Sequence, residues 1–380
     1  MTLPLKPPIL PMLAKRAEAL PDGEGWRFEP KWDGFRALVF RDGGEVYLQS
    51  RDGRPLARYF PDLLAPLAQQ LPTRCVLDGE IVIEQGGALD FEALQLRLHP
   101  AASRVALLAQ RQPAAMVFFD LLALGDADLT GEAFARRRAR LERIGTRLRA
   151  PLHVTPATAD RTEAADWFRR FEGAGLDGIV AKRAGGRYEP DQRVMVKVKH
   201  ARECDCVVAG FRWHRSGRAA GVGSLLLGLY DAAGQLQHVG VCASFTAAMR
   251  RDLVKVLEPH RVSGLRGHPW QDWAEAAVDE AGRRRPGASS RWSAGKDLSW
   301  EPLRIGLVAE VGYDHMQGDR FRHTAQFRRW RPDKPARECT YAQLEVAAPE
   351  ELASIFGDGL RARRRPKVTT AATAPRPRRP

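Results

Sequence analysis

The sequence predicts an α+β protein, in which a domain built on antiparallel sheet is followed by a smaller β-barrel. Strand-like runs alternate with helical segments as far as about residue 200. From residue 204, short strands with turn signals follow one another closely, as in small barrels. The length of 380 residues fits two domains and a tail. We therefore expect domains at 1–200 and 201–345, then a short helix and a basic, disordered tail at 346–380.

The first domain is expected to open with a proline-rich, extended segment over residues 1–25. A hairpin follows, because runs 37–40 and 46–50 are separated by Asp42-Gly-Gly. Periodicity predicts further strands at 76–84, 115–122, 178–182 and 195–199, and helices at 61–70, 91–98, 131–149 and 164–173. In the third of these helices, Arg136–Arg138 are expected to form a solvated face.

The second domain is expected to contain strands at 204–211, 223–230, 236–242 and 306–313, with a helix at 246–258. The stretch 282–299 is rich in Arg, Gly and Ser and predicts a loop.

Composition excludes several classes of protein. Hydrophobic residues make up 44% of the chain and charged residues 28%, as in globular proteins. We find neither an apolar run of membrane-spanning length nor a secretory signal. The five cysteines are an odd number and scattered, which favours reduced thiols in the cytoplasm over a disulfide framework or a zinc site.

The net charge of +14 points to a polyanionic partner, nucleic acid before membrane. Residues 361–380 hold eight basic side chains and no acid. The alternative is a solvated tail that only improves solubility.

The hexapeptide from Lys31 to Arg36, Lys-Trp-Asp-Gly-Phe-Arg, is the most informative segment. It suits either a surface turn or a nucleophilic lysine. A lysine attacks phosphorus only when it is unprotonated, and neighbouring cations lower its pKa toward that state.

Further motifs supply suitable partners for such a lysine. Asp78 and Glu80 alternate on one face of a predicted strand, where they suit a ribose hydroxyl and a metal. A buried strand carries Phe119, an aromatic that can stack on a base. Asp177 adds an acid, and Lys197 and Lys199 share one face of a strand, as cations beside phosphates do. A dense basic cluster follows at 322–334.

In this order and spacing, the motifs resemble those of covalent nucleotidyltransferases, and most closely the ATP-dependent DNA ligases, over roughly residues 8–345. The segments 11–14, 91–97 and 330–334 are similar to those of compact bacterial ligases of the ligase C type. The resemblance implies an adenylyltransferase domain followed by an OB-fold domain. It also implies nick sealing in DNA repair, in which AMP passes from ATP to Lys31 and then to the 5′-phosphate of the DNA.

The resemblance further implies a role for each matching residue. Glu29 would contact adenine, Phe119 would stack on it, and Glu80 would hold the ribose. The implied phosphate ligands are Arg36, Arg51, Lys197 and Lys199, and Arg51 would also meet the 5′-phosphate of the nick. Asp78 and Asp177 would bind Mg²⁺ or Mn²⁺, while Arg331 and Lys334 would orient pyrophosphate.

The sequence departs from the family pattern at three positions. Asp177 stands where many ligases have Glu, which puts metal coordination in doubt. Met195 replaces the usual Trp before the paired lysines, and Asp191 replaces a common Arg. We expect Arg193 to take the place of that arginine in binding the nucleotide.

The implied partner is nicked double-stranded DNA, contacted by Arg51, Arg97 and Arg212. The loops 212–218 and 283–291 are candidate DNA contacts, or else ordinary solvated loops. We expect a hinge near 200–203 that lets the barrel close over ATP and later grip DNA. We expect the protein to be a monomer that associates with the nucleoid and not with a membrane. A repair polymerase or an end-binding protein is the expected protein partner.

Three other functions stay open at this point. An mRNA capping guanylyltransferase would use GTP, an RNA ligase would seal RNA duplexes, and an inactive scaffold would bind DNA without taking up AMP. Competition between ATP and GTP for labelling Lys31 tests the first. Comparing the sealing of nicked DNA with that of nicked RNA duplex tests the second, and AMP uptake by the purified protein tests the third.

Overall fold

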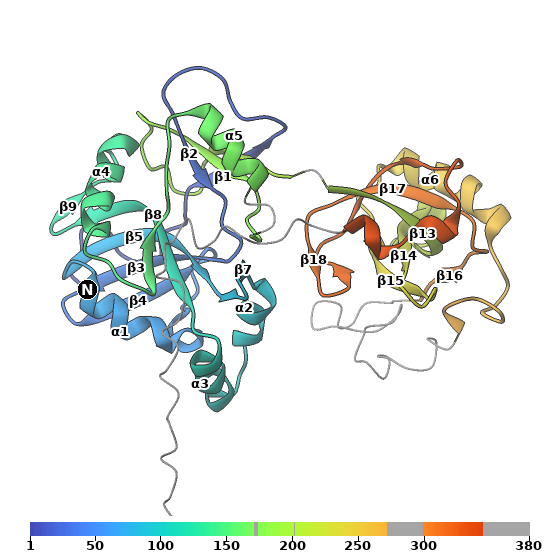
Figure 1. Cartoon of the computed structure of the whole chain (residues 1–380), viewed down its shortest axis with the longest axis horizontal. Helices are drawn as coiled ribbons and strands as arrows, with labels where there is room; N and C mark the ends of the chain where they lie inside the picture. The colour runs from blue at the N-terminus through green and yellow to red at the C-terminus, as the bar shows by residue number, and fades with distance from the viewer. Residues whose placement is uncertain (171–173, 201, 272–298, 345–380) are drawn as a thin grey trace, which may run out of the picture. The chain divides into compact units, whose positions relative to one another are not determined.

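Antiparallel sheet is the main element of both parts of the chain. The computed structural model describes residues 1–170, 174–200, 202–271 and 299–344. These residues fall into two units, the first ending at Lys199 and the second beginning at His200. Figure 1 shows sheets with helices in each unit, so the predicted α+β class is confirmed. The segments 283–291 and 346–380, for which we predicted DNA contacts, a helix and a tail, lie outside the described residues.

The larger sheet of the first unit has the strand order β10-β8-β5-β3-β4, with β9 beside β8. Its strands are β3 (Phe35–Asp42), β4 (Glu45–Ser50), β5 (Arg74–Val82), β8 (Ala115–Leu124), β9 (Ala127–Asp128) and β10 (Leu152–Val154). The predicted hairpin is confirmed, since β3 and β4 pair with Asp42 opposite Glu45. Its turn begins at Gly43, whose φ of 61° favours glycine.

Helices cover this sheet and bury its apolar side chains. They are α1 (Pro61–Gln70), α2 (Phe91–Arg97), α3 (Ala102–Arg111) and α4 (Phe134–Gly145), and a small ribbon, β6 (Glu84–Gln85) and β7 (Ala88–Leu89), precedes α2. The helix α5 (Arg161–Arg170) instead packs on the smaller sheet of this unit, where Ala164 shares a core with Phe28. Leu63 and Leu67 of α1 pack in one core with Leu77 of β5. Sequence reasoning missed α3, although Val105 and Ala109, the two residues that it buries, recur at the helical spacing of four.

A smaller sheet of four strands has the order β1-β12-β11-β2. Its strands are β1 (Leu13–Ala17), β2 (Trp26–Pro30), β11 (Ile179–Arg183) and β12 (Arg193–Val198). The expectation that 1–25 is only an extended lead-in is therefore wrong at β1, which pairs in parallel with β12. The sequence of β1, Leu-Ala-Lys-Arg-Ala, has no alternation of apolar and polar residues. It forms a strand because its backbone pairs with β12.

The pairing of β2 with β11 continues past the strand ends and fixes the position of Lys31. The Lys31 amide donates to the Gly178 carbonyl at 2.8 Å, and the Asp177 amide donates to the Lys31 carbonyl at 2.9 Å. Gly178 has a φ of 107°, and a Cβ there would lie 2.0 Å from the Val198 carbonyl oxygen. Only glycine fits this crossing, which brings Lys31 beside Asp177 and the end of β12.

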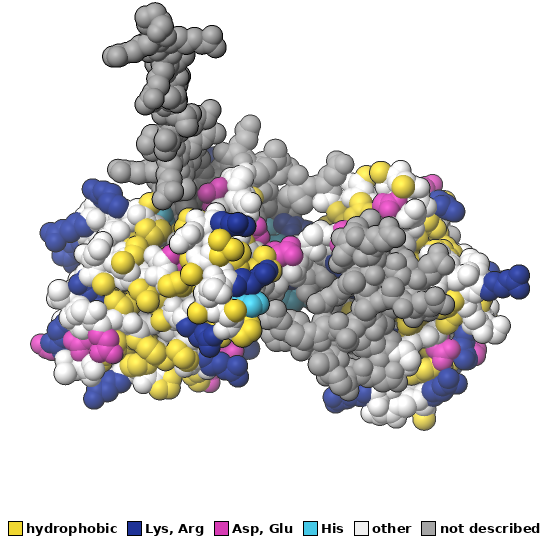
Figure 2. Space-filling view, turned by 90° about the horizontal axis from the view of Figure 1, so that it is seen from below, with side chains coloured by type: hydrophobic (Ala, Val, Ile, Leu, Met, Phe, Trp, Pro, Cys, Tyr) yellow, Lys and Arg dark blue, Asp and Glu magenta, His cyan; other side chains and the backbone are white. Residues whose placement is uncertain are grey.

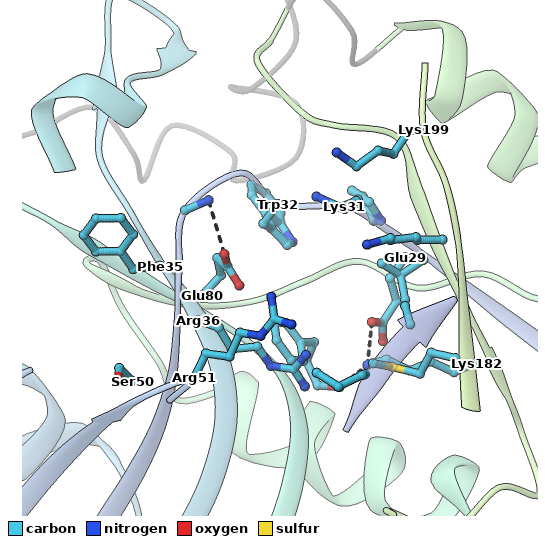
Figure 3. A pocket seen from close by; sticks show the side chains of 18 of the residues that line it. Glu29, Lys31, Trp32, Phe35, Arg36, Ser50, Arg51, Glu80, Lys182 and Lys199 are labelled. Carbon is cyan, nitrogen blue, oxygen red and sulfur yellow. Dashed lines mark hydrogen bonds and ion pairs between the residues drawn. The ribbon is translucent and has the colours of Figure 1, made fainter. Parts of the chain in front are cut away.

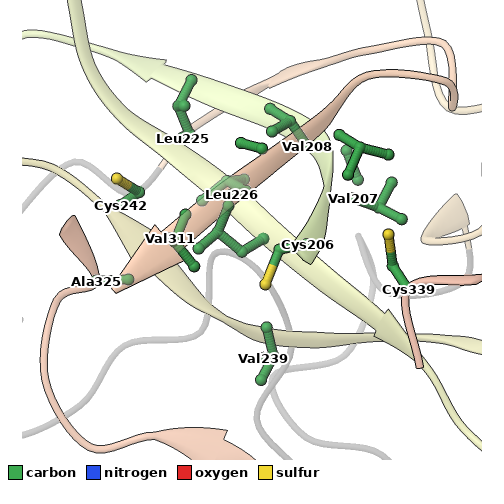
Figure 4. Close-up of a cluster of buried hydrophobic side chains, with 14 of the residues drawn as sticks. Cys206, Val207, Val208, Leu225, Leu226, Val239, Cys242, Val311, Ala325 and Cys339 are labelled. Atoms are coloured by element: carbon green, nitrogen blue, oxygen red, sulfur yellow. The ribbon is translucent and has the colours of Figure 1, made fainter. Parts of the chain in front are cut away.

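The second unit is built around a sheet with the order β15-β14-β13-β17-β20, and β16 also pairs with β13. The elements are β13 (Arg202–Trp213), β14 (Val222–Tyr230), β15 (Leu236–Cys242), α6 (Ala247–Leu257), β16 (Glu301–Pro302), β17 (Val308–Tyr313), β18 (Met316–Gln317), β19 (Arg320–Phe321) and β20 (Gln326–Trp330). Its core, drawn in Figure 4, includes Val207, Leu226, Val239 and Val311. The predicted strands and helix of this region are confirmed.

Two further observations concern residues outside the site. All five cysteines are buried, free thiols. Within the described parts of the chain, no helix is both long and apolar enough to cross a membrane.

The predicted solvated face at 136–138 is wrong for two of its three arginines. Arg137 is fully buried, and its Nε and Nη2 donate to the two carboxylate oxygens of Asp120 on β8 at 2.8 and 2.9 Å. Arg138 is buried as well, while Arg136 is exposed. Sequence reasoning missed these arginines because their acidic partners lie on distant strands.

We expect Arg137→Met to lower the free energy of unfolding by about 3–5 kcal/mol, because it leaves the Asp120 carboxylate buried without its partner. Arg136→Met on the same helix should change stability by less than about 0.5 kcal/mol. Urea unfolding followed by circular dichroism measures both, and equal stability of the two variants would contradict a structural role for the buried pair.

Candidate active site

A cavity of about 510 Å³ opens in the first unit and is lined from both of its sheets (Figure 3). Most of the nucleotide-binding residues predicted from the sequence meet here. Those lining the cavity are Glu29, Lys31, Arg36, Arg51, Glu80, Phe119, Arg193, Lys197 and Lys199, and Lys182 joins them.

The Lys31 side chain is held by an acid that it shares with a second lysine. Its Nζ lies 2.6 Å from Oδ2 of Asp177, and Nζ of Lys199 lies 2.9 Å from the same oxygen. Asp177 is almost wholly buried, so this interaction is shielded from water. A lysine amine acts as a nucleophile only after it has lost its proton.

Lys197 brings a further positive charge to this end of the cavity. Burial lowers the pKa of Lys197, and the charges of Lys31, Lys199, Arg193 and Arg51 lower it further. A cluster of cations with one nearby carboxylate is an arrangement that attracts phosphate groups.

Glu80 lies on β5 and accepts a hydrogen bond from the Gly34 amide at 3.2 Å. Burial raises the pKa of Glu80 to about 7, against the opposing effects of Lys31 and Arg36. A carboxyl group with this pKa changes charge near neutral pH and is suited to accept from, or donate to, a hydroxyl.

Arg36 reaches the cavity from β3, and its guanidinium is held in place by a buried acid. Its Nε and Nη2 lie 2.9 and 2.5 Å from the two carboxylate oxygens of Asp78, and the Tyr188 hydroxyl donates to Asp78 at 2.7 Å. Asp78 is fully buried and does not line the cavity. Asp78 therefore holds Arg36 in place, and its position gives no support to the expectation that it binds metal.

The other end of the cavity combines an aromatic ring with a buried carboxylate. Glu29 on β2 lies 2.7 Å from Nζ of Lys182, as the dashed line in Figure 3 marks, and 3.2 Å from Nη1 of Arg138. Lys182 and the Arg36 guanidinium lie 4.7 and 5.1 Å from the Phe119 ring centre. Arg138 and Tyr188 support this site and were missed, because nothing in their local sequence shows which acids they meet.

The predicted DNA contacts Arg97 and Arg212 lie elsewhere. Arg97 is wholly buried, pairs with Asp62 at 2.6 Å and donates to the Tyr59 and Gln112 carbonyls, so the prediction that it binds DNA is wrong. Arg212 belongs to strand β13 and is only partly exposed, so it is not the loop residue that we expected.

Arg331 and Lys334 lie in the second unit and are paired within it. Nη1 of Arg331 is 3.0 Å from the Asp205 carboxylate, and its Nη2 is 2.8 Å from Asp333. Lys334 pairs with the exposed Glu338 at 3.3 Å.

The cavity can hold a divalent cation only if a phosphate group of the ligand supplies some of the ligand atoms. Among the residues that the structure describes, no three acidic, His or Cys side chains are grouped to hold a metal. Mg²⁺, however, is commonly bound by one or two carboxylates together with substrate phosphates. Asp177 is not one of the lining residues, but it supplies such a carboxylate directly beside Lys31 and Lys199.

We expect the pH dependence of stability to report on Glu80. In the unfolded chain its pKa is the ordinary 4.5, so folding takes up a proton between pH 4.5 and about 7. Relative to Glu80→Gln, the wild type should therefore lose about 1–3 kcal/mol of unfolding free energy as pH rises through this window, and no more above it. Urea unfolding at a series of pH values tests this, and parallel curves would contradict it.

Comparison with known proteins agrees with this site. A family model described as the ATP dependent DNA ligase domain matches residues 11–199, and one described as the ATP dependent DNA ligase C terminal region matches 218–334. DNA ligase C2 of Mycolicibacterium smegmatis is 57% identical over 355 residues, which are 93% of this chain and 99% of that protein. DNA ligase C of Mycobacterium tuberculosis is 54% identical over 367 residues, which are 95% and 100% of the two chains.

A solved structure supports the fold. A Lig E DNA ligase, described as binding DNA with a minimal scaffold, aligns with 85% of this chain and 100% of its own, with a TM-score of 0.51 and 16% identity. The likeness agrees with the predicted adenylyltransferase domain followed by an OB-fold domain. The chain is therefore a member of the ATP-dependent DNA ligase family.

Proposed function

We propose that this chain seals nicks in duplex DNA, with Lys31 carrying AMP from ATP to the DNA. The observation that carries the proposal is the position of the Lys31 amine, which enters one cavity with a cluster of cations and with an aromatic ring beside a carboxylate. The cations Arg36, Arg51 and Lys197 suit a triphosphate. Phe119 and Glu29 suit a purine that offers an amino group.

The proposed reaction consists of three phosphoryl transfers, as the resemblance to the family implies. In the first, Lys31 Nζ loses its proton and attacks the α-phosphorus of ATP. A P–N bond forms as the bond to pyrophosphate breaks. In the second, an oxygen of the DNA 5′-phosphate attacks the same phosphorus, so the P–N bond breaks and the amine regains a proton. In the third, the 3′-hydroxyl loses its proton, attacks the 5′-phosphorus and expels AMP. Catalysis of such steps rests mainly on positioning and charge neutralisation.

The roles of the cavity residues follow their positions. Glu29 accepts from the adenine amino group, Phe119 stacks on the base and Glu80 meets the ribose. The residues that we assign to the phosphates are Arg36, Arg51, Arg193, Lys197 and Lys199, and Arg51 also serves the 5′-phosphate of the nick. Asp177 would hold Mg²⁺ or Mn²⁺, which when bound neutralises phosphate charge.

Arg331 and Lys334 are proposed to act only while pyrophosphate is present, in the first step. Pyrophosphate carries several negative charges, and two cations from the second unit stabilise its departure. The later steps release no pyrophosphate, so they do not need these side chains.

The net charge of +14 supports binding to the phosphate backbone of nicked DNA. On the face that Figure 2 shows, Lys and Arg side chains stand at several separated places on each unit. Such scattered charge suits a ligand with phosphates along its length. Association with the nucleoid, and with a repair polymerase or an end-binding protein, completes the proposal.

We expect Lys31→Ala to lose the AMP adduct and to reduce sealing of nicked DNA by at least about 1,000-fold, because no other group forms the P–N bond. Peptide mass analysis after incubation with ATP and Mg²⁺ locates the adduct. The variant should still seal DNA that already carries AMP on its 5′-phosphate. A wild-type chain that seals DNA with unmodified Lys31, or takes up GMP from GTP in preference to AMP, would contradict the proposal.

We expect Lys334→Ala to slow transfer of AMP to Lys31 by about 100-fold, since pyrophosphate loses a cation. Sealing of pre-adenylated DNA should change by less than about threefold. Lys255→Ala is the matched control, because this exposed lysine of the same unit pairs with Asp252 on its own helix. Single-turnover assays measure each step, and equal slowing of both steps would argue against a role confined to pyrophosphate.

A further inference from the structure

Arg138 is a buried arginine of α4 whose three donor groups reach three different parts of the first unit. Its Nη1 lies 3.2 Å from Oε1 of Glu29 on β2. Its Nη2 donates to the Thr155 carbonyl at 2.5 Å, and its Nε donates to Glu142 of its own helix at 2.8 Å. Together these contacts fix the plane of the guanidinium, because each donor has its own acceptor.

The arrangement fixes the Glu29 carboxylate as well. Glu29 has only 2% of its surface exposed, and it lines the cavity two residues before Lys31. Oε1 faces Arg138 and Oε2 faces Lys182 at 2.7 Å. With a different cation on each oxygen, the carboxylate cannot turn about its last bond without losing an ion pair. Each oxygen keeps lone pairs for a ligand in the cavity.

A carboxylate fixed in this way distinguishes purines by the group at position 6. Adenine carries an amino group there, which donates a hydrogen bond, whereas guanine carries an oxygen, which only accepts. An ionised carboxylate accepts hydrogen bonds and donates none. At position 6, it therefore binds the amino group of adenine and repels the oxygen of guanine, as long as it keeps this orientation.

We propose that Arg138 is a positioning residue for nucleotide selection, which holds Glu29 in the orientation that recognises the amino group of adenine. The inference rests on the proposed contact between Glu29 and adenine and adds the reason for its selectivity. Arg138 touches no nucleotide itself and acts through Glu29 alone.

The test compares two nucleotides that differ only in the amino group. Single-turnover formation of the Lys31 adduct is measured with ATP and with purine riboside triphosphate, which has hydrogen at position 6. The readout is the ratio of the two rates in one enzyme preparation. This ratio does not depend on the fraction of folded protein, so a loss of stability alone leaves it unchanged.

We expect the wild type to prefer ATP by about tenfold or more, the usual effect of one hydrogen bond to a charged group. Arg138→Met should reduce the preference to less than about threefold, and Arg138→Lys should retain most of it because the charge remains. Arg143→Met, an exposed arginine of the same helix, should match the wild type. If Arg138→Met folds poorly, Arg138→Gln, which keeps a donor for the Thr155 carbonyl, should show the same loss of preference.

Glu29→Ala distinguishes a failure of the adenine contact from a failure of the role of Arg138. If Glu29→Ala loses the preference for ATP while Arg138→Met and Arg138→Gln keep it, the role of Arg138 is wrong and the adenine contact stands. If Glu29→Ala keeps the preference, the contact between Glu29 and adenine is wrong, and the inference about Arg138 is overturned with it.

Discussion

Repulsion between like charges is the constraint that shapes the cavity. Lys31, Lys197 and Lys199 gather within one small space, and the pKa of Lys197 is lowered by burial and then by its cationic neighbours. Asp177 relieves part of this repulsion by pairing with Lys31 and Lys199 through one oxygen. A triphosphate that enters such a space replaces repulsion with attraction. The cavity is thus prepared for its ligand before the ligand arrives, because the protein fold has already brought the cations together.

Behind the cations lies a second set of charges that never meets the ligand directly. Asp78 on β5 holds Arg36 on β3, and Asp120 on β8 holds Arg137 on α4. The next residue of α4, Arg138, pairs with Glu29 on β2. Two successive arginines of one helix therefore join the larger sheet to the smaller sheet. Since both sheets line the cavity, α4 sets the distance between its walls.

Sequence reasoning identified the chemistry of the site better than its supports. Lys31, Glu80 and Lys197 stand in short motifs whose spacing reports a shared function, and the structure brings them into one cavity. Arg97 and Arg138 are charged residues on helices, where a solvated position is the usual outcome. Their burial depends on Asp62 and Glu29, which meet them only after the chain has folded. Pairing across long separations carries no local signal, and the same is true of β1.

The parallel pairing of β1 with β12 has a consequence for synthesis on the ribosome. Leu13 lies opposite Arg193, so the strand that carries Lys197 is completed by one of the first segments to be translated. At ordinary rates of elongation, β1 waits on the order of 10–40 s for its neighbour to leave the exit tunnel. Nascent chains shorter than about two hundred residues thus contain Lys31 but lack a completed β12, so the cavity that Lys31 lines closes only when the end of the first unit has been made.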